Sequence, residues 1–282
     1  MDIISLLFAP VADDVLLFAI LFLSLGLAAY LGQTSYRVRA ADHQEATLVP
    51  GAILSLSGLL IGFMFSLSIG GYAARGQSEV REALAIGQVW QYAGLQSADG
   101  QKKTETLLKA YLDDRVHFFT EETVPGQRVW GQLSREKQHQ LWQSVVGLAS
   151  HNPTPIMASV LSAYSALSTS SQETQANWRR QIPDAAWVVL ILFSACASFL
   201  SGYHYRHQAV RHLFIILLPG LTALALFMIA EIDLPGEGII RVTPDDLHQL
   251  SLSLFTPAKA TVAPQPVAII GAGGFRDVAA AG

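Results

Sequence analysis

Four long apolar stretches constrain this chain more than any other feature of its sequence. An α-helix rises 1.5 Å per residue, so about 20 apolar residues cross the hydrocarbon core of a bilayer. Residues 15–31, 48–72, 185–203 and 213–232 meet this requirement. The sequence therefore predicts an all-α integral membrane protein with a bundle of four transmembrane helices.

The charged residues agree with a membrane protein and argue against a nucleic-acid partner. They make up 14% of the 282 residues, whereas a soluble globular domain carries about 25%. The net charge is only −4 and there is no basic tract, so the electrostatic footprint of a nucleic-acid-binding protein is missing. The segment before the first stretch is acidic, unlike a signal peptide, and we interpret that stretch as a retained span. Arginines are divided almost evenly between the two sides, which leaves the orientation open.

A polar region separates the second and third stretches, and its patterning predicts helices rather than strands. Apolar residues recur at helical spacing between residues 107 and 119, with charged residues on the opposite face. Ser134 is a candidate N-cap, and Thr154 with Pro155 is typical of the start of another helix. We therefore expect three or four helices, the first of them a direct continuation of the second span.

The predicted order of elements divides the chain into four parts. Residues 1–72 hold the first two transmembrane helices, residues 73–184 a helical extramembrane domain, and residues 185–234 the other two transmembrane helices. Residues 235–282 comprise a turn, a short helix ending near Phe255 and a flexible tail. A Thr-Pro-Asp-Asp sequence favours the helix start, and the composition rich in Pro, Ala and Thr is typical of a linker.

The sequence contains no convincing catalytic, metal or cofactor site. Cys196 is the single cysteine and lies in an apolar stretch, so it has no partner for a disulfide or a zinc site. Three histidines around the loop between the third and fourth spans lack an acidic or cysteine partner for a metal: His204, His207 and His212. The glycine-rich segment 267–275 is followed by too few residues for a dinucleotide-binding fold. We therefore expect neither an enzyme nor a bound cofactor or metal.

The second span carries two neighbouring stripes of side chains. Small residues recur every four positions: Gly58, Gly62, Ser66 and Gly70. Such spacing lets another helix approach closely, and helix packing is one interpretation of it. The adjacent stripe consists of Ile61, Phe65 and Ile69. These side chains would form a hydrophobic constriction, able to gate by dewetting, if several copies of the helix surrounded a pore. Contact with lipid or with other spans is the alternative.

Ionisable residues lie close to the ends of the second and fourth spans. Arg75 is a candidate pore-mouth charge, a headgroup anchor, or a partner for Glu79 one turn further along the helix. Glu79 and Glu82 are expected on a solvated or interhelical face. Glu231 and Asp233 end the fourth stretch, and their position near the membrane surface favours a role in an end-of-helix turn over a proton relay.

Three segments together resemble one known family. They are GLLIGFMFSLSIGGYAARGQSEVREALAIG from Gly58 to Gly87, RQIPDAAW from Arg180 to Trp187, and DLPGEGIIRV from Asp233 to Val242. Their order and spacing resemble the bestrophin-like membrane family, in which two spans, a helical insert and two further spans are followed by a turn. In this chain the turn motif consists of Asp233, Pro235 and Gly238.

The resemblance implies a function through the more distant bestrophins, which are pentameric anion channels with a pore lined by the second transmembrane helix. It implies self-association, small anions as partners, and Ile61, Phe65 and Ile69 as the narrow part of the pore. It also implies a protein of the cell (inner) membrane with both termini and residues 73–184 in the cytoplasm. The acidic calcium clasp of bestrophins has no clear counterpart here. A non-conducting scaffold, whose insert binds a partner protein, is the alternative function.

Overall fold

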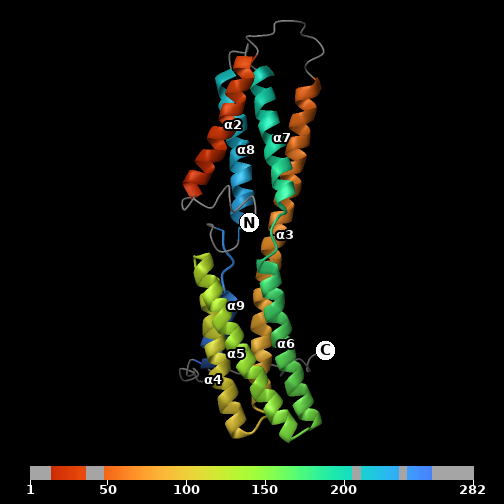
Figure 1. The fold of residues 1–282 in the computed structure, drawn as a ribbon, viewed down its shortest axis with the longest axis vertical. Coiled ribbons are helices and arrows are strands. Elements are labelled where there is room, and N and C mark those ends of the chain that lie inside the picture. Colours follow the sequence, from red (N-terminus) through yellow and green to blue (C-terminus); the bar gives the residue numbers. More distant parts are fainter. Residues whose placement is uncertain (1–13, 36–47, 205–210, 235–239, 256–282) are drawn as a thin grey trace, which may run out of the picture.

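The computed structural model describes residues 14–35, 48–204, 211–234 and 240–255 (Figure 1). Its helices are α2 (Asp14–Ser35), α3 (Leu48–Ala93), α4 (Ala98–Thr120), α5 (Val124–His151), α6 (Pro155–Trp178), α7 (Asp184–His204), α8 (Arg211–Asp233) and α9 (Asp245–Phe255). The described residues contain no strand, so the predicted all-α class is confirmed.

Four of these helices are long and apolar enough to cross a membrane, as the sequence predicted. They are α2, α7, α8 and α3, of which α3 is much longer than a bilayer requires. The four lie together at one end of the elongated molecule (Figure 1). Their shared core contains Leu21 and Leu25 of α2, Trp187 and Leu190 of α7, and Leu226 and Ile229 of α8. Many of the other apolar side chains on these helices are exposed, as on a surface that faces lipid.

Helices α2 and α7 pack backbone against backbone in the membrane bundle. Gly32 faces the backbone of Phe199, and Gly202 faces the backbone of Ala29. A Cβ atom at either glycine would collide with the facing carbonyl oxygen. Membrane helices usually associate by close approach through small residues. The hydrophobic effect does not drive their association in lipid, so van der Waals packing has to do so.

The other end of the molecule is a helical domain built on the second half of α3. Helix α3 runs from the membrane bundle into this domain without a break, as predicted, and is 46 residues long. Helix α6 packs along α3, α5 packs along α4, and α9 contacts both α3 and α4. The apolar core of this domain includes Ile86 and Val89 of α3, Leu108 and Leu112 of α4, Leu141 of α5 and Leu167 of α6.

Polar side chains start three helices of this domain. Oxygens of Ser97, Thr123 and Thr154 each accept a hydrogen bond from the backbone N–H group three residues further on. The predicted start at Thr154 is therefore confirmed. The prediction that Ser134 starts a helix is wrong, because Ser134 is buried in the middle of α5. Helix α5 begins earlier, where Thr123 and Pro125 together favour a helix start.

Candidate functional site

One face of α3 in the membrane bundle has no neighbour within the described part of the chain. Ser57, Met64 and Ser68 are buried against the other spans, and the Ser68 hydroxyl donates to the carbonyl oxygen of Ile229 at 3.3 Å. The opposite side of α3 is exposed, and α3 lies at the edge of the bundle (Figure 1). We call this side the outward face of α3. It carries a stripe of small residues beside exposed apolar ones such as Leu59 and Phe63; the stripe consists of Gly51, Ser55, Gly58, Gly62, Ser66 and Gly70.

The small residues of the outward face contact no other helix of the same chain. A Cβ atom added at Gly58, Gly62 or Gly70 would have no heavy atom within 4 Å. Ser66 is exposed as well. The packing role predicted for these four residues therefore requires a second chain, and it stays a prediction.

The three pore-lining candidates lie along the edge between the outward face and the buried face of α3. Ile61 is half-buried and packs against the core of the membrane bundle. Phe65 and Ile69 are 36% and 46% exposed, respectively. The side chains thus become progressively more accessible toward the insert, where a single chain leaves Ile69 on the outward face. Their pore-lining role remains a prediction.

Arg75 is buried where the membrane bundle meets the insert. Its guanidinium donates a hydrogen bond to the carbonyl oxygen of Ile232, in the last turn of α8. The Asp233 carboxylate is close enough to interact with it electrostatically. Among the described residues Arg75 forms no ion pair with Glu79, so its contact is with α8 instead. A role at a pore mouth stays a prediction.

Asp233 joins the end of α8 to the start of α7. Its two carboxylate oxygens lie 3.0 and 3.2 Å from the backbone nitrogen of Ile182, which donates to them just before α7 begins. A negative charge is favourable at this end of a helix, where N–H groups lack partners within the helix. Asp233 and Arg75 therefore tie α3, α7 and α8 together at one point. Pro235 and Gly238, the other residues of the turn motif, lie outside the described residues.

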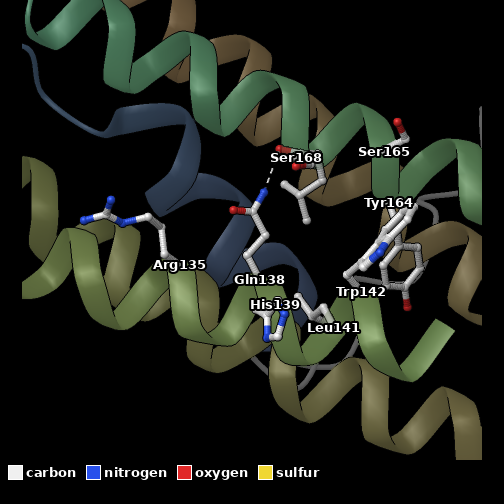
Figure 2. Close-up of a pocket in the computed structure, with 9 residues that line it drawn as sticks. Arg135, Gln138, His139, Leu141, Trp142, Tyr164, Ser165 and Ser168 are labelled. Carbon is white, nitrogen blue, oxygen red and sulfur yellow. Dashed lines mark hydrogen bonds between the residues drawn. The ribbon is translucent and has the colours of Figure 1, made fainter. Parts of the chain in front are cut away.

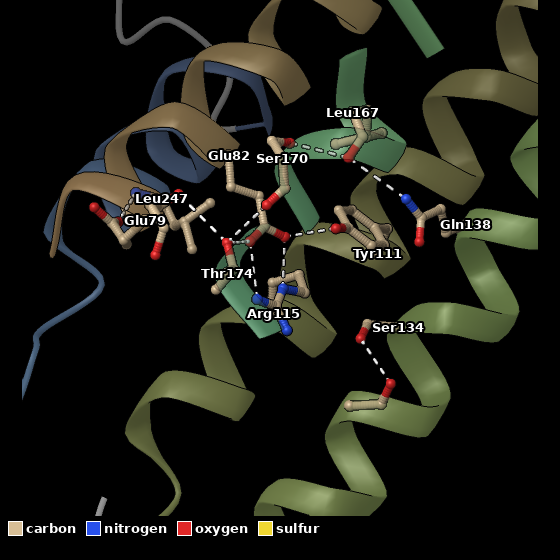
Figure 3. A network of polar contacts seen from close by, with 12 residues as sticks. Glu79, Glu82, Tyr111, Arg115, Ser134, Gln138, Leu167, Ser170, Thr174 and Leu247 are labelled. Carbon is tan, nitrogen blue, oxygen red and sulfur yellow. Dashed lines mark hydrogen bonds and ion pairs between the residues drawn. The ribbon is translucent and has the colours of Figure 1, made fainter. Parts of the chain in front are cut away.

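A fully buried ion pair lies about two turns further along α3, inside the insert (Figure 3). Nε and NH2 of Arg115 on α4 donate to the two carboxylate oxygens of Glu82, at 2.6 and 2.8 Å. The hydroxyl groups of Tyr111 and Thr174 donate to the same carboxylate, at 2.5 and 2.8 Å. Helices α3, α4 and α6 therefore meet on one carboxylate, whose hydrogen-bonding capacity is well used.

The electrostatics of this network favour a structural role over proton transfer. Burial by itself would lower the pKa of Arg115, but the Glu82 carboxylate and Tyr111 outweigh it and raise the pKa above its usual value. Burial, with the Glu82 charge, raises the pKa of Tyr111 well above its ordinary range. The guanidinium thus stays charged and the phenol stays neutral at any ordinary pH. A paired and hydrogen-bonded charge of this kind holds helices in register.

Glu79 makes a second link, between α3 and helix α9, which follows the fourth span and packs on the insert. Its Oε1 atom accepts a hydrogen bond of 2.9 Å from the backbone N–H group of Leu247, in the first turn of α9. Leu247 itself is fully buried in the core of the insert. Of the two environments predicted for Glu79 and Glu82, the interhelical one is therefore correct.

Arg115 is the residue of this network that sequence reasoning missed. The signal was present, because Arg115 lies on the same face of α4 as the apolar residues Leu108, Leu112 and Phe119. A charge on an apolar helix face needs a counter-charge once that face is buried. Its partner Glu82 is 33 positions away, and no local pattern distinguishes Glu82 from the other glutamates.

The elements that carry these contacts correspond to one family model. A model of the Bestrophin-like domain matches residues 18–247. The chain belongs to the bestrophin-like family. The match begins in α2 and ends in α9, so it includes the spans and the insert of this bestrophin-like chain. The resemblance found in the sequence motifs is thereby confirmed.

Solved structures with the same fold include bestrophins from bacteria. A mutant of a bacterial Bestrophin homolog from Klebsiella pneumoniae has a TM-score of 0.65 and 11% identity, over 85% of this chain and 99% of that chain. Another structure of that homologue has a TM-score of 0.62 and 10% identity, over 86% of this chain and 97% of that chain. A proline-to-alanine mutant of a membrane protein has a TM-score of 0.65 and 9% identity, over 86% of this chain and 99% of that chain. Among curated proteins none matches. The chain is thus an integral membrane protein with a bestrophin-like fold.

Proposed function

We propose that this protein forms a ring of subunits in the membrane and conducts small anions through a pore lined by α3. The outward face of α3 carries the proposal, because a stripe of glycine and serine is exposed along it beside the leucine and phenylalanine residues that suit contact with lipid. Small residues mark membrane-helix surfaces against which another helix packs. A second copy of the chain supplies the helix that is missing there.

A ring accounts for the apolar residues beside that face. If the small residues contact the neighbouring subunit, Ile61, Phe65 and Ile69 turn toward the axis around which the subunits are arranged. A head-to-tail contact that repeats with a closing rotation gives such a ring. Apolar side chains around a narrow axis form a constriction that gates by dewetting.

Family membership supports the finer features of the proposal. By analogy with bestrophins the ring has five subunits, the conducted ions are anions, and the protein lies in the inner membrane. Residues 73–184 and both termini are then cytoplasmic. Arg75 lies just beyond the span, at the level of the cytoplasmic mouth of the pore in this arrangement.

Halide flux into liposomes that contain the purified full-length protein tests this function. Phe65→Ala and Ile69→Ala shorten the side chains of the constriction, so we expect flux to rise several-fold or the preference among halides to change. Leu192→Ala is the matched control, since Leu192 is an exposed apolar residue on α7 and has no place in the pore. This variant is expected to conduct like the unmodified protein.

Two results would contradict the proposal in different ways. Absence of flux from a folded sample, whose ring of subunits has been verified by mass, would rule out simple conduction. Equal changes in flux from Leu192→Ala and Phe65→Ala would show that α3 does not line the pathway.

A membrane scaffold is the second candidate function. Exposed apolar side chains on α5 of the insert favour it, notably Val129, Leu133 and Trp142, because such positions are suited to binding another protein. A scaffold predicts a monomer or dimer without flux, whereas a channel predicts a ring.

A further inference from the structure

A groove between α5 and α6 of the insert has the size of a small-molecule site (Figure 2). Its volume is about 430 Å³, within the range of about 300–1,000 Å³ that is usual for ligand pockets. The buried residues Leu141, Tyr164 and Leu167 form its floor. Polar and aromatic side chains of both helices complete its lining: Arg135, Gln138, His139, Trp142, Ser165 and Ser168.

One end of the groove is aromatic. Trp142 and Tyr164 lie close to each other there, on opposite helices (Figure 2). The Tyr164 hydroxyl is already engaged, 2.7 Å from the Thr104 hydroxyl and 3.1 Å from the Gln96 amide nitrogen, and the residue is only 3% exposed, so it closes this end of the groove. Trp142 is 41% exposed, although tryptophan is usually highly buried. The Trp142 ring therefore provides a flat apolar surface for a ligand ring, above the floor that Tyr164 forms.

The other end of the groove is positively charged. Arg135 lies at the rim there, separated from the two rings by Gln138, and its guanidinium is directed away from Gln138 (Figure 2). Its Nε atom donates to the carbonyl oxygen of Gly131 at 2.9 Å, which orients the guanidinium and leaves its terminal nitrogens for another acceptor. His139 is the other ionisable residue of the lining, and no carboxylate belongs to it. The groove therefore combines a cationic end with an aromatic end.

We propose that this groove binds a small organic anion with a flat apolar part. Its acidic group, a carboxylate or similar, pairs with Arg135, and its ring lies against Trp142 and Tyr164. Arg135 lies about 17 Å along α5 from its membrane-proximal start at Val124 (Figure 1), which places the groove beyond the lipid headgroups. The ligand is therefore a soluble molecule, and the proposal does not depend on conduction.

Calorimetric titration of the full-length protein in lipid nanodiscs tests the site, with 2-naphthoate as the probe and empty nanodiscs as the blank. The neutral analogue 2-naphthamide measures the contribution of the charge. We expect 2-naphthoate to bind, 2-naphthamide to bind at least about tenfold more weakly, and Arg135→Gln to weaken 2-naphthoate binding by about tenfold, the effect of losing one charge-assisted hydrogen bond. Trp142→Ala should weaken both probes.

Two variants on the same helix serve as controls. Arg128→Gln removes an exposed positive charge, and Leu133→Ala shortens an exposed apolar side chain; neither residue lines the groove. Both are expected to bind 2-naphthoate as the unmodified protein does. The proposal is overturned if 2-naphthoate gives no saturable heat up to millimolar concentration, if the amide binds as tightly as the acid, or if Arg128→Gln and Arg135→Gln weaken binding equally.

Discussion

At the scale of single residues, the pair formed by Glu82 and Arg115 is especially sensitive to substitution. Glu82→Gln leaves a fully buried guanidinium without its counter-charge, which costs about 3–5 kcal/mol of folding free energy. We expect a large fall in the thermal-unfolding midpoint of the purified protein in detergent. Glu173→Gln is the control, because the Arg81–Glu173 pair is exposed and contributes less than about 1 kcal/mol. Similar midpoints for the two variants would show that the buried pair does not hold the insert.

The glycines of the membrane bundle differ sharply in what a methyl group would meet. Gly202→Ala places a Cβ atom against the carbonyl group of Ala29, whereas Gly26→Ala on α2 places one in open space. The first variant must push α2 away from α7, and we expect it to lose about 1–3 kcal/mol of stability. The second should unfold like the unmodified protein when both are followed as monodisperse fractions after heating in detergent. A destabilised Gly26→Ala with an unaffected Gly202→Ala would contradict the α2–α7 packing.

At the scale of elements, Asp233 makes the start of α7 depend on the end of α8. Asp233→Asn removes the negative charge that the Ile182 amide and Arg75 share. We expect faster hydrogen exchange at Ile182 and in the first turn of α7, with little change in α5. Glu122→Gln removes an exposed carboxylate that pairs with Arg241 and provides the matched loss of charge. Unchanged exchange in α7 of Asp233→Asn would mean that α7 starts independently of α8.

Elements were predictable from the sequence where the signal was local, and contacts between elements were not. Long apolar stretches located the spans, and Thr154 marked a helix start correctly. The prediction at Ser134 was wrong because a serine before an apolar pattern resembles an N-cap. The helix in fact begins after Thr123 and continues past Ser134. The partner of Arg115 depends on residues far apart in the chain. Gly62 has no neighbour within the described part of its own chain, and one sequence does not specify whether a second chain packs against it.

At the scale of the whole molecule, the outward face of α3 predicts how assembly responds to side-chain size. Gly62→Leu fills space that is open within one chain, so the fold of the monomer should survive while the ring of subunits breaks into smaller species. Gly26→Leu, on α2, also meets nothing within 4 Å and should leave the assembly intact. Native mass spectrometry from detergent distinguishes these outcomes. An intact ring in Gly62→Leu would place the interface between copies elsewhere.

The unbroken length of α3 has a mechanical consequence. Its 46 residues make a helix of about 70 Å. Near its middle, Ser68 and Arg75 bind α8, and Glu79 and Glu82 bind the elements outside the membrane bundle. Because the helix is continuous, a tilt of about 5° about Glu82 moves Phe65, about 25 Å away along α3, by about 2 Å. A force that displaces the insert is therefore expected to move α3 within the bilayer, at the level of Phe65 and Ile69.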